Sequence, residues 1–123
     1  ESYVDPLPTE YHSAFDAINN DNNNLLIVAE SDHKIIGTLQ LTFISGLTYR
    51  GGKRAFIEGV RIDETQRGQG VGKLMVEWAI TRAREAGCHI VQLTSDKERK
   101  DTIRFYEKLG FIASHEGLKL HLS

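Results

Sequence analysis

A glycine-rich segment near the middle of the chain has the residue types and spacing of an anion-binding turn. It reads Gln66-Arg67-Gly68-Gln69-Gly70-Val71-Gly72-Lys73 and lies between a strand-like run, residues 54–62, and a helix-like run, residues 71–86. Glycines let the backbone approach an anion closely. The free N–H groups and the dipole at the start of a helix favour negative charge. The segment therefore predicts a site for a phosphate, most often a pyrophosphate.

The spacing of the glycines excludes two common phosphate motifs. A Walker loop needs G-x-x-x-x-G-K-[ST], but only three residues separate Gly68 from Gly72, and Leu74 follows Lys73. A dinucleotide fingerprint would need glycine at position 73. The remaining pattern, R-x-x-G-x-G, resembles the coenzyme A pyrophosphate loop of the GCN5-related N-acetyltransferases (the GNAT family).

A second segment supports this resemblance. The run Arg104-Phe105-Tyr106-Glu107-Lys108-Leu109-Gly110-Phe111 is similar to the family signature F-Y-x-x-x-G-F, in which a helix ends at glycine and runs into a strand. Asp101 is the expected N-cap of that helix, and Gly110 is the expected residue just beyond its C-terminus. With both motifs in the family's order, the resemblance extends from about residue 25 to the C-terminus.

Composition limits the class of protein. The 123 residues predict one domain, 1–123, able to bury roughly two-thirds of its unfolded surface. Fifteen basic and 17 acidic residues give a net charge of −2, so neither a nucleic acid nor a membrane is expected as a partner. One cysteine and no visible signal peptide or membrane span predict a cytoplasmic protein. The histidine spacings predict no metal site.

The periodicity of apolar residues predicts an alternation of strands and helices. A first helix, Thr9–Asn19, would have Thr9 as its N-cap and an apolar stripe of Tyr11, Phe15 and Ile18. The elements expected after it are a hairpin of strands 25–30 and 34–43, a glycine-containing loop 44–53, strand 54–62, helix 71–86, strand 89–94, the helix of Tyr106, and strands 111–115 and 119–122. The predicted fold class is α/β: an α+β mixed sheet, mostly antiparallel, flanked by helices.

The resemblance adds two expectations about this fold. Family members have a parallel strand pair that splays apart, so a splayed pair is expected here. They also begin with a strand and a helix before the segment matching Thr9–Asn19, whereas this chain begins at Glu1. The domain is therefore expected to lack those two elements, which would leave the first sheet edge open and remove a helix that lines part of the acceptor site.

The resemblance implies direct transfer of an acetyl group from acetyl-CoA to a primary amine in a ternary complex. Tyr106 matches the family tyrosine that donates a proton to the coenzyme A sulfur. A phenol with a pKa of about 10 suits that role because it stays protonated until a thiolate forms. The alternative is that Tyr106 packs beside Phe105 and bonds a backbone carbonyl.

Glu58 is the candidate base. It lies on the strand that enters the glycine-rich loop, where many family members carry a glutamate, and strand alternation predicts that it faces the same side as Val60 and Ile62. A carboxylate with a pKa of about 4.3 would need burial or a relaying water to deprotonate an ammonium group. The alternative is an ion pair with Arg54 or Arg61.

Cofactor contacts are expected mainly from the backbone. In the family the strand matching Val60, Arg61 and Ile62 binds the pantetheine arm, and the loop from Gln66 to Lys73 binds the pyrophosphate, so both roles are expected here. The alternative for the glycines is a surface turn. Arg99 replaces a family asparagine, so that asparagine's contact is not expected. Lys97, Arg99 and Lys100 either contact the ribose phosphate or form a solvated face.

The acceptor site is the least determined feature. Tyr49 could form a wall of the site, and Arg50, Lys53 and Arg54 could attract an anionic group. The pattern resembles bacterial small-molecule acetyltransferases, including aminoalkylphosphonate N-acetyltransferases. The alternative is a mobile hairpin with solvated charges. Four further residues have structural interpretations: Cys88 as a small buried hydrophobe, Trp78 as core, and His115 and His121 as surface or sheet residues.

Three functions remain open at this stage. The first is acetylation of a small primary amine, the second is acetylation of a protein or peptide amine, and the third is a non-catalytic acetyl-CoA-binding module that regulates a partner. Retention of both Glu58 and Tyr106 argues against the third. Homodimers are common in the family, although no interface is evident in this sequence.

Overall fold

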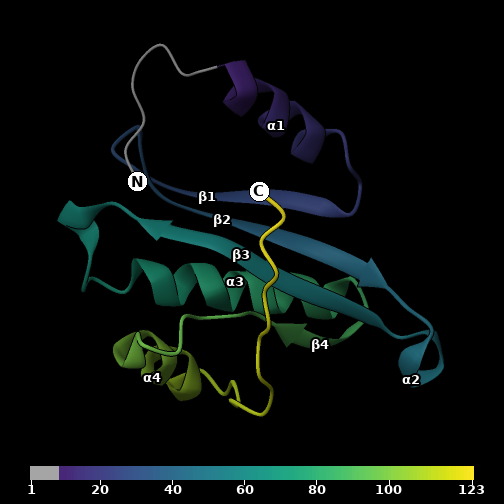
Figure 1. The fold of residues 1–123 in the computed structure, drawn as a ribbon. Coiled ribbons are helices and arrows are strands. Elements are labelled where there is room, and N and C mark those ends of the chain that lie inside the picture. The colour runs from purple at the N-terminus through teal and green to yellow at the C-terminus, as the bar shows by residue number, and fades with distance from the viewer. Residues whose placement is uncertain (1–8) are drawn as a thin grey trace.

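A four-stranded mixed sheet forms the centre of the molecule. The computed structural model describes residues 9–123, with side chains from His12 onward. The strands lie in the order β1 (Asn24–Ser31), β2 (Lys34–Ser45), β3 (Lys53–Ile62) and β4 (Cys88–Gln92) (Figure 1). The first three run antiparallel and β3 pairs with β4 in parallel. The predicted mixed sheet is confirmed.

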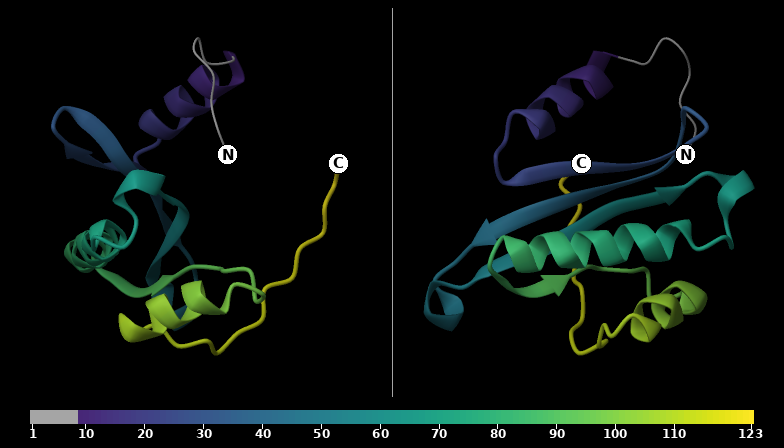
Figure 2. Two further views of the ribbon diagram at one scale, coloured as in Figure 1. Left: turned by 90° about the vertical axis from the view of Figure 1, so that its left-hand side faces the viewer. Right: turned by 180° about the vertical axis from the view of Figure 1, so that it is seen from behind.

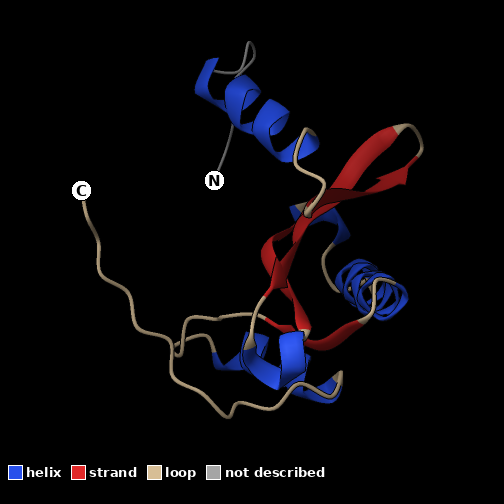
Figure 3. Ribbon diagram, turned by 90° about the vertical axis from the view of Figure 1, so that its right-hand side faces the viewer, coloured by secondary structure: helices blue, strands red, loops and turns tan. Residues whose placement is uncertain are grey.

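Helices flank this sheet. They are α1 (Thr9–Asn19), α2 (Thr48–Gly51), α3 (Val71–Glu85) and α4 (Lys100–Lys108). Figures 2 and 3 show α3 against one face of the sheet, with α1 and the C-terminal tail on the other side. The bounds of α1 agree with the prediction, whereas its proposed N-cap Thr9 and the stripe residue Tyr11 lie outside the described side chains. Of the other stripe residues, Ile18 is half-buried and Phe15 is 50% exposed.

The hydrophobic core lies between α3 and one face of the sheet. Alternate residues on β2 and β3 enter it, and α3 contributes positions at helical spacing. Its buried members include Leu39, Leu41, Ala55, Ile57, Met75, Val76, Ala79 and Ala83. Complete burial of a leucine side chain is worth about 1.5–3 kcal/mol. This layer holds β3 against the start of α3, which positions the turn between them.

Trp78 is not a core residue. Its side chain is 52% exposed, and Leu74 one turn earlier is 68% exposed. With Leu26 and Val28 of β1 they line an open groove of about 420 Å³. Helix α3 has apolar residues on more than one face, and only the face that packs on Leu39 and its neighbours is buried. Among the described strands, β1 has a partner on one side only.

The two C-terminal strands predicted at residues 111–115 and 119–122 are absent. Leu118, Leu120 and Leu122 alternate as in a strand, but their side chains are 93%, 85% and 92% exposed. An alternating sequence forms a strand only when a neighbouring strand pairs with it, and no described strand pairs with this segment. The tail leaves the body of the molecule as an extended arm (Figure 2).

Two smaller expectations are also wrong. The segment 44–53 is not all loop, because β2 continues to Ser45 and α2 lies within it. The N-cap of α4 is Arg99 rather than Asp101, which lies in the first turn and pairs with Arg104. Asp101 still carries negative charge at a helix start, which is favourable.

The expected glycine ending of α4 is confirmed. Gly110 has φ 102°, and its N–H donates to the Glu107 carbonyl while the Phe111 N–H donates to the Tyr106 carbonyl. This is the Schellman arrangement, which satisfies carbonyls that the helix leaves free.

We expect Leu41→Ala to lower the free energy of unfolding by about 2–5 kcal/mol, because it removes buried methyl groups and leaves a cavity. The matched control is Leu47→Ala, where the side chain is 96% exposed and the expected change is within about 0.5 kcal/mol. Urea unfolding of both variants measures the difference. Equal losses would show that Leu41 is not in the core.

Candidate active site

Strand β3 contains a bulge at Gly59. The β2–β3 register passes from Thr38 opposite Arg61 to Gln40 opposite Glu58, so β3 has one more residue than β2 between these pairs. Gly59 has φ 61°, a left-handed conformation that glycine adopts without a Cβ penalty. A glycine in this conformation is typical of a β-bulge.

The bulge turns Glu58 to the opposite face from Val60 and Ile62. Ile57 is in the core on the α3 side, and Val60 and Ile62 pack against the same core. Glu58, next to Ile57, is exposed. The expectation that Glu58 shares a face with Val60 and Ile62 is therefore wrong, because simple alternation does not hold across an inserted residue.

Strand β4 separates from β3 partway along. Their parallel register runs from Lys53 opposite Cys88 to Phe56 opposite Gln92, where β4 ends while β3 continues to Ile62. Within the described chain, residues 57–62 of β3 thus have no strand on that side. Backbone N–H and C=O groups on that edge of β3 are left without strand partners, and such groups need partners from elsewhere. The splayed parallel pair is confirmed.

The connection from β3 to α3 begins with a tight turn. The Asp63 carboxylate accepts hydrogen bonds from the Thr65 N–H (3.0 Å) and the Thr65 hydroxyl (3.1 Å). These bonds, the backbone bond first, hold the pKa of Asp63 below its usual value. A 3₁₀ turn, Glu64–Gln66, follows, and the Arg67 Nε donates to the Ile62 carbonyl at 3.4 Å.

The glycine-rich loop then opens α3 without a side-chain cap. Gly68 and Gly70 have φ values of 81° and 83°, and no neighbouring atom lies within 4 Å of where either Cβ would be. Gly70 is the N-cap of α3 and has no side chain to occupy the first N–H groups. Free donors and open space at a helix start are suited to an anion, and the pyrophosphate contact of this loop stays a prediction.

Tyr106 is buried on α4. Its side chain is 9% exposed and makes edge-to-face contacts with Phe105 and Phe111, at centroid distances of 5.0 and 5.6 Å. Burial raises the pKa of Tyr106, and the positive charge of Arg99 opposes that rise. A Cβ on Gly72 would lie 3.7 Å from the Phe105 Cζ, so α4 packs against the first turn of α3.

The Tyr106 hydroxyl is accessible despite this burial. No hydrogen bond from it to any described residue is found, and no described side-chain oxygen is both fully buried and unpartnered. The oxygen therefore reaches solvent. Packing beside Phe105 is observed, but the carbonyl bond of the alternative interpretation is not.

Glu58 lies across the β2–β3 pair from Gln40. Its suggested ion-pair partner Arg54 instead donates from Nη1 to the Gln92 Oε1 at 3.1 Å. Glu58 thus lies beside the point where β3 and β4 separate, with its carboxylate exposed.

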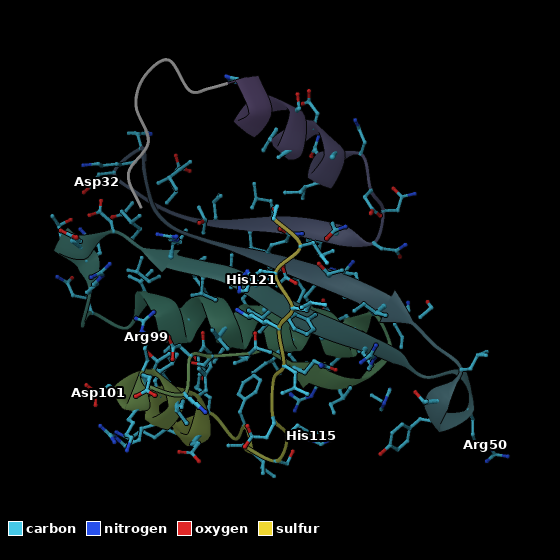
Figure 4. The ribbon with its side chains drawn as sticks, in the orientation of Figure 1. Asp32, Arg50, Arg99, Asp101, His115 and His121 are labelled. Carbon is cyan, nitrogen blue, oxygen red and sulfur yellow. The ribbon has the colours of Figure 1, made fainter. Side chains whose placement is uncertain are left out.

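Tyr49 and Arg50 lie far from Glu58. Both are on α2, at the end of the sheet opposite the glycine-rich loop, as Figure 4 shows for Arg50. The Tyr49 ring is 79% exposed and tilts against His89 at 4.7 Å. Since β3 begins at Lys53, the distance along the strand to Glu58 is about 17 Å. The structure does not bring the predicted acceptor residues Tyr49 and Arg50 to the proposed base.

The remaining candidates are peripheral. Lys97, Arg99 and Lys100 are exposed, and the last two line a shallow hollow at the start of α4. Figure 4 labels Arg99 at this end of the helix. Cys88 is half-buried against the core, and burial raises its pKa. His115 and His121 are exposed. In the described part of the chain, no three His, Cys, Asp or Glu side chains are grouped to hold a metal ion. None of the described helices is long and apolar enough to cross a membrane.

Sequence reasoning missed a polar network beside Glu58. Gln40 and Thr42 of β2 both donate to the Asn24 Oδ1, at 2.8 and 2.7 Å, and the Asn24 Nδ2 donates to Asp21 at 2.9 Å. The signal was the alternation of Thr38, Gln40 and Thr42 with buried leucines, which marks a polar face on β2.

Residues 1–111 match the Acetyltransferase (GNAT) family, and the chain belongs to it. A solved structure described as a transcriptional regulator from Bacillus halodurans C-125 is 57% identical, with a TM-score of 0.95, and the match covers 99% of this chain and 81% of that one.

Two curated relatives match this chain over a smaller share of its length than that structure does. Glucosamine 6-phosphate N-acetyltransferase of Trypanosoma brucei brucei is 34% identical, and the match covers 72% of this chain and 58% of the relative. Aminoalkylphosphonate N-acetyltransferase of Salmonella typhimurium is 39% identical, covering 40% of this chain and 32% of the relative. The chain thus spans 58% of the length of the first relative and 32% of the length of the second.

Two glycines in the loop should respond oppositely to alanine. Gly70→Ala places a Cβ in a left-handed conformation and should lower the free energy of unfolding by about 1–2 kcal/mol. Gly72→Ala, in the first turn of α3 with only ordinary contacts around its Cβ, should raise it by about 0.5–1 kcal/mol. Urea unfolding distinguishes them. A stabilising Gly70→Ala would contradict the loop geometry.

The Tyr106 phenol should lose its proton at a higher pH than an ordinary tyrosine. Because burial raises the pKa of Tyr106, its tyrosinate absorbance should appear above the ordinary pH of about 10, and the difference spectrum between wild type and Tyr106→Phe isolates it. Its contribution to stability is fully present below pH about 10 and is lost as pH rises through the raised pKa. A Tyr106 signal at or below the ordinary value would contradict its burial.

Proposed function

We propose that this chain transfers the acetyl group of acetyl-CoA directly to a primary amine of a small molecule in a ternary complex. The observation that carries this proposal is the uncapped glycine-rich loop at the end of β3, beyond the point where β4 stops pairing with that strand. Backbone groups of β3 that β4 leaves without a strand partner lead to that loop, and α4, which carries Tyr106, packs against the first turn of the helix that the loop opens.

The proposed cofactor contacts follow this path. Val60, Arg61 and Ile62 would pair through their backbone with the amides of the pantetheine arm, where β4 no longer pairs with β3. The N–H groups of the loop would bind the pyrophosphate. The loop residues assigned to this role are Gln66, Arg67, Gly68, Gln69, Gly70, Val71, Gly72 and Lys73.

The proposed chemistry uses two proton carriers. When bound, acetyl-CoA supplies a thioester carbonyl as the electrophile. An ammonium acceptor loses two protons in becoming an amide: Glu58 passes the first to solvent, directly or through a water. The second replaces the proton that Tyr106 gives to the departing sulfur, so the phenol is restored. A raised pKa keeps Tyr106 protonated and ready to donate.

A regulatory module is the second candidate, favoured by one observation. The Bacillus halodurans structure, 57% identical to this chain, is described as a transcriptional regulator. A net charge of −2 gives no electrostatic footprint for DNA. Acetylation of a protein or peptide amine remains the alternative within the enzyme class.

An acceptor panel tests the proposal. The protein is incubated with acetyl-CoA and small amines, polyamines, amino acids, phosphorylated amines or peptides, and released coenzyme A and acetylated product are measured. Turnover on a small amine supports the proposal, and turnover on peptides alone favours the protein-directed alternative. Acetyl-CoA binding without turnover favours the regulatory module. No binding contradicts all three.

We expect Tyr106→Phe to lower kcat by about 10²–10³-fold, because the ring packing is kept and only the proton donor is lost. The loss should be smaller with a thioester whose thiol leaves more easily. Unchanged turnover at every pH would exclude Tyr106 as the acid.

Glu58→Gln should lower kcat/KM by about 10²-fold at neutral pH and alter its pH profile, because the amide cannot accept the ammonium proton and turnover then requires acceptor that is already deprotonated. Its exposed position predicts little change in urea stability, which serves as the folding control. An unaltered pH profile would assign the base to another group.

Gly70→Asp should weaken acetyl-CoA binding by at least about 10-fold, since it places a carboxylate among the proposed phosphate donors. Gly70→Asn is the matched control for backbone strain, because it has a similar shape and no charge. Calorimetry measures both. Equal affinities of the two variants would contradict the pyrophosphate assignment.

A further inference from the structure

We propose that Arg54 forms an anion subsite, so that the acceptor carries a phosphate or phosphonate in addition to its amine. This inference rests on the proposed acetyl transfer and names the substrate class of that same site. It concerns the sheet face opposite α3, where Glu58 lies.

Register places Arg54 and Glu58 on that face together. Ala55 and Ile57 enter the core against α3, so the residues alternating with them, Arg54, Phe56 and Glu58, face the other way. Arg54 and Glu58 are four positions apart in the sequence, about 13 Å along the strand. The Arg54 guanidinium extends to Gln92, which lies opposite Phe56, two positions nearer to Glu58 along β3.

The Glu58 end of this face is built to accept N–H donors. Gln40 lies directly opposite Glu58, and its Nε2 is engaged by the Asn24 Oδ1 at 2.8 Å and the Thr42 Oγ1 at 3.5 Å. Asn24 is in turn held by Asp21. With its Nε2 bonded toward β1, Gln40 keeps its Oε1 as an acceptor on the strand next to Glu58. The Gln40 Oε1 and the Glu58 carboxylate are both acceptors, which suits an ammonium group with its three donors.

The Arg54 end has the opposite character. Arg54 is half-buried, and its Nη1 donates to the neutral Gln92 Oε1 at 3.1 Å. None of the described carboxylates pairs with it. A guanidinium has five N–H donors in a planar fork, which matches the oxygens of a phosphate or phosphonate. Partial burial strengthens such a pair relative to one in open water.

The other cations of this segment are placed differently. Lys53 points to the α3 side, where its Nζ donates to the Ala86 carbonyl at 3.2 Å, and Arg50 lies on α2 at the tip of the hairpin. Among the three cations that sequence reasoning grouped here, only Arg54 shares a face with Glu58. The acceptors named for two relatives, glucosamine 6-phosphate and aminoalkylphosphonate, both combine an amine with a phosphorus oxyanion.

The test compares matched acceptors. Glucosamine 6-phosphate is paired with glucosamine, and 3-aminopropylphosphonate with propylamine. We expect wild-type kcat/KM to be about 10- to 100-fold higher on the anionic member of at least one pair, the value of one charged hydrogen-bonded contact. Arg54→Gln should reduce this ratio to near one. Arg84→Gln removes the same charge from the exposed surface of α3 and should leave the ratio unchanged.

A binding measurement separates this inference from the proposed function. Calorimetry of glucosamine 6-phosphate against wild type and Arg54→Gln needs no turnover, and the Arg54 Nε–H signal should shift on binding in NMR. Turnover with equal efficiency on both members of both pairs overturns the anion subsite and leaves the acetyltransferase intact. Binding that requires Arg54 without turnover supports the subsite and contradicts the enzyme. Equal affinities of wild type and Arg54→Gln for glucosamine 6-phosphate overturn the subsite.

Discussion

The separation of β4 from β3 after Phe56 is the constraint on which the rest of the site depends. Up to that point β3 is a central strand, held between β2 and β4. Beyond it, β3 keeps β2 and is supported from the α3 side by packing of Val60 and Ile62 on the core. Backbone groups that would otherwise complete a sheet are left for a ligand, because they need partners. Helix α3, which follows this strand, begins without a side-chain cap. Its first N–H groups therefore add further free donors next to the end of β3.

The bulge at Gly59 gives β3 two separate roles. Before it, Glu58 faces the polar side of the sheet with Gln40 and Arg54. After it, Val60 and Ile62 are returned to the core, so the strand stays anchored while it approaches the loop. One extra residue in β3 thus lets the proposed base lie on one face of the sheet while Val60 and Ile62 still pack on the core at the other face. Tyr106 completes the arrangement from α4, buried by aromatic neighbours yet with an accessible hydroxyl.

Local signals in the sequence predicted most elements, and long-range pairing accounts for the errors. The strand–glycine–helix pattern from β3 to α3 and the glycine ending of α4 depend on nearby residues, and both are confirmed. The side of the sheet that Glu58 faces depends on a register shift against β2, which alternation along β3 cannot reveal. The alternating leucines of the tail would form a strand only beside a neighbouring strand, and Trp78 would be buried only under a covering element. Neither is present among the described residues, so the apolar pattern alone predicted a strand and a core residue wrongly. The Asn24–Gln40 network joins residues from separate elements and has no local signature.

An NMR titration of the amide signals with coenzyme A tests the central claim most directly. The account predicts that the largest shifts fall on residues 57–62 of β3 and on the loop from Gly68 to Lys73, and that dephospho-coenzyme A, which keeps the pyrophosphate, reproduces them. Pantetheine alone should shift β3 and leave the loop signals in place. Shifts confined to another surface, such as the groove beside Trp78, or no shifts at all, would contradict it.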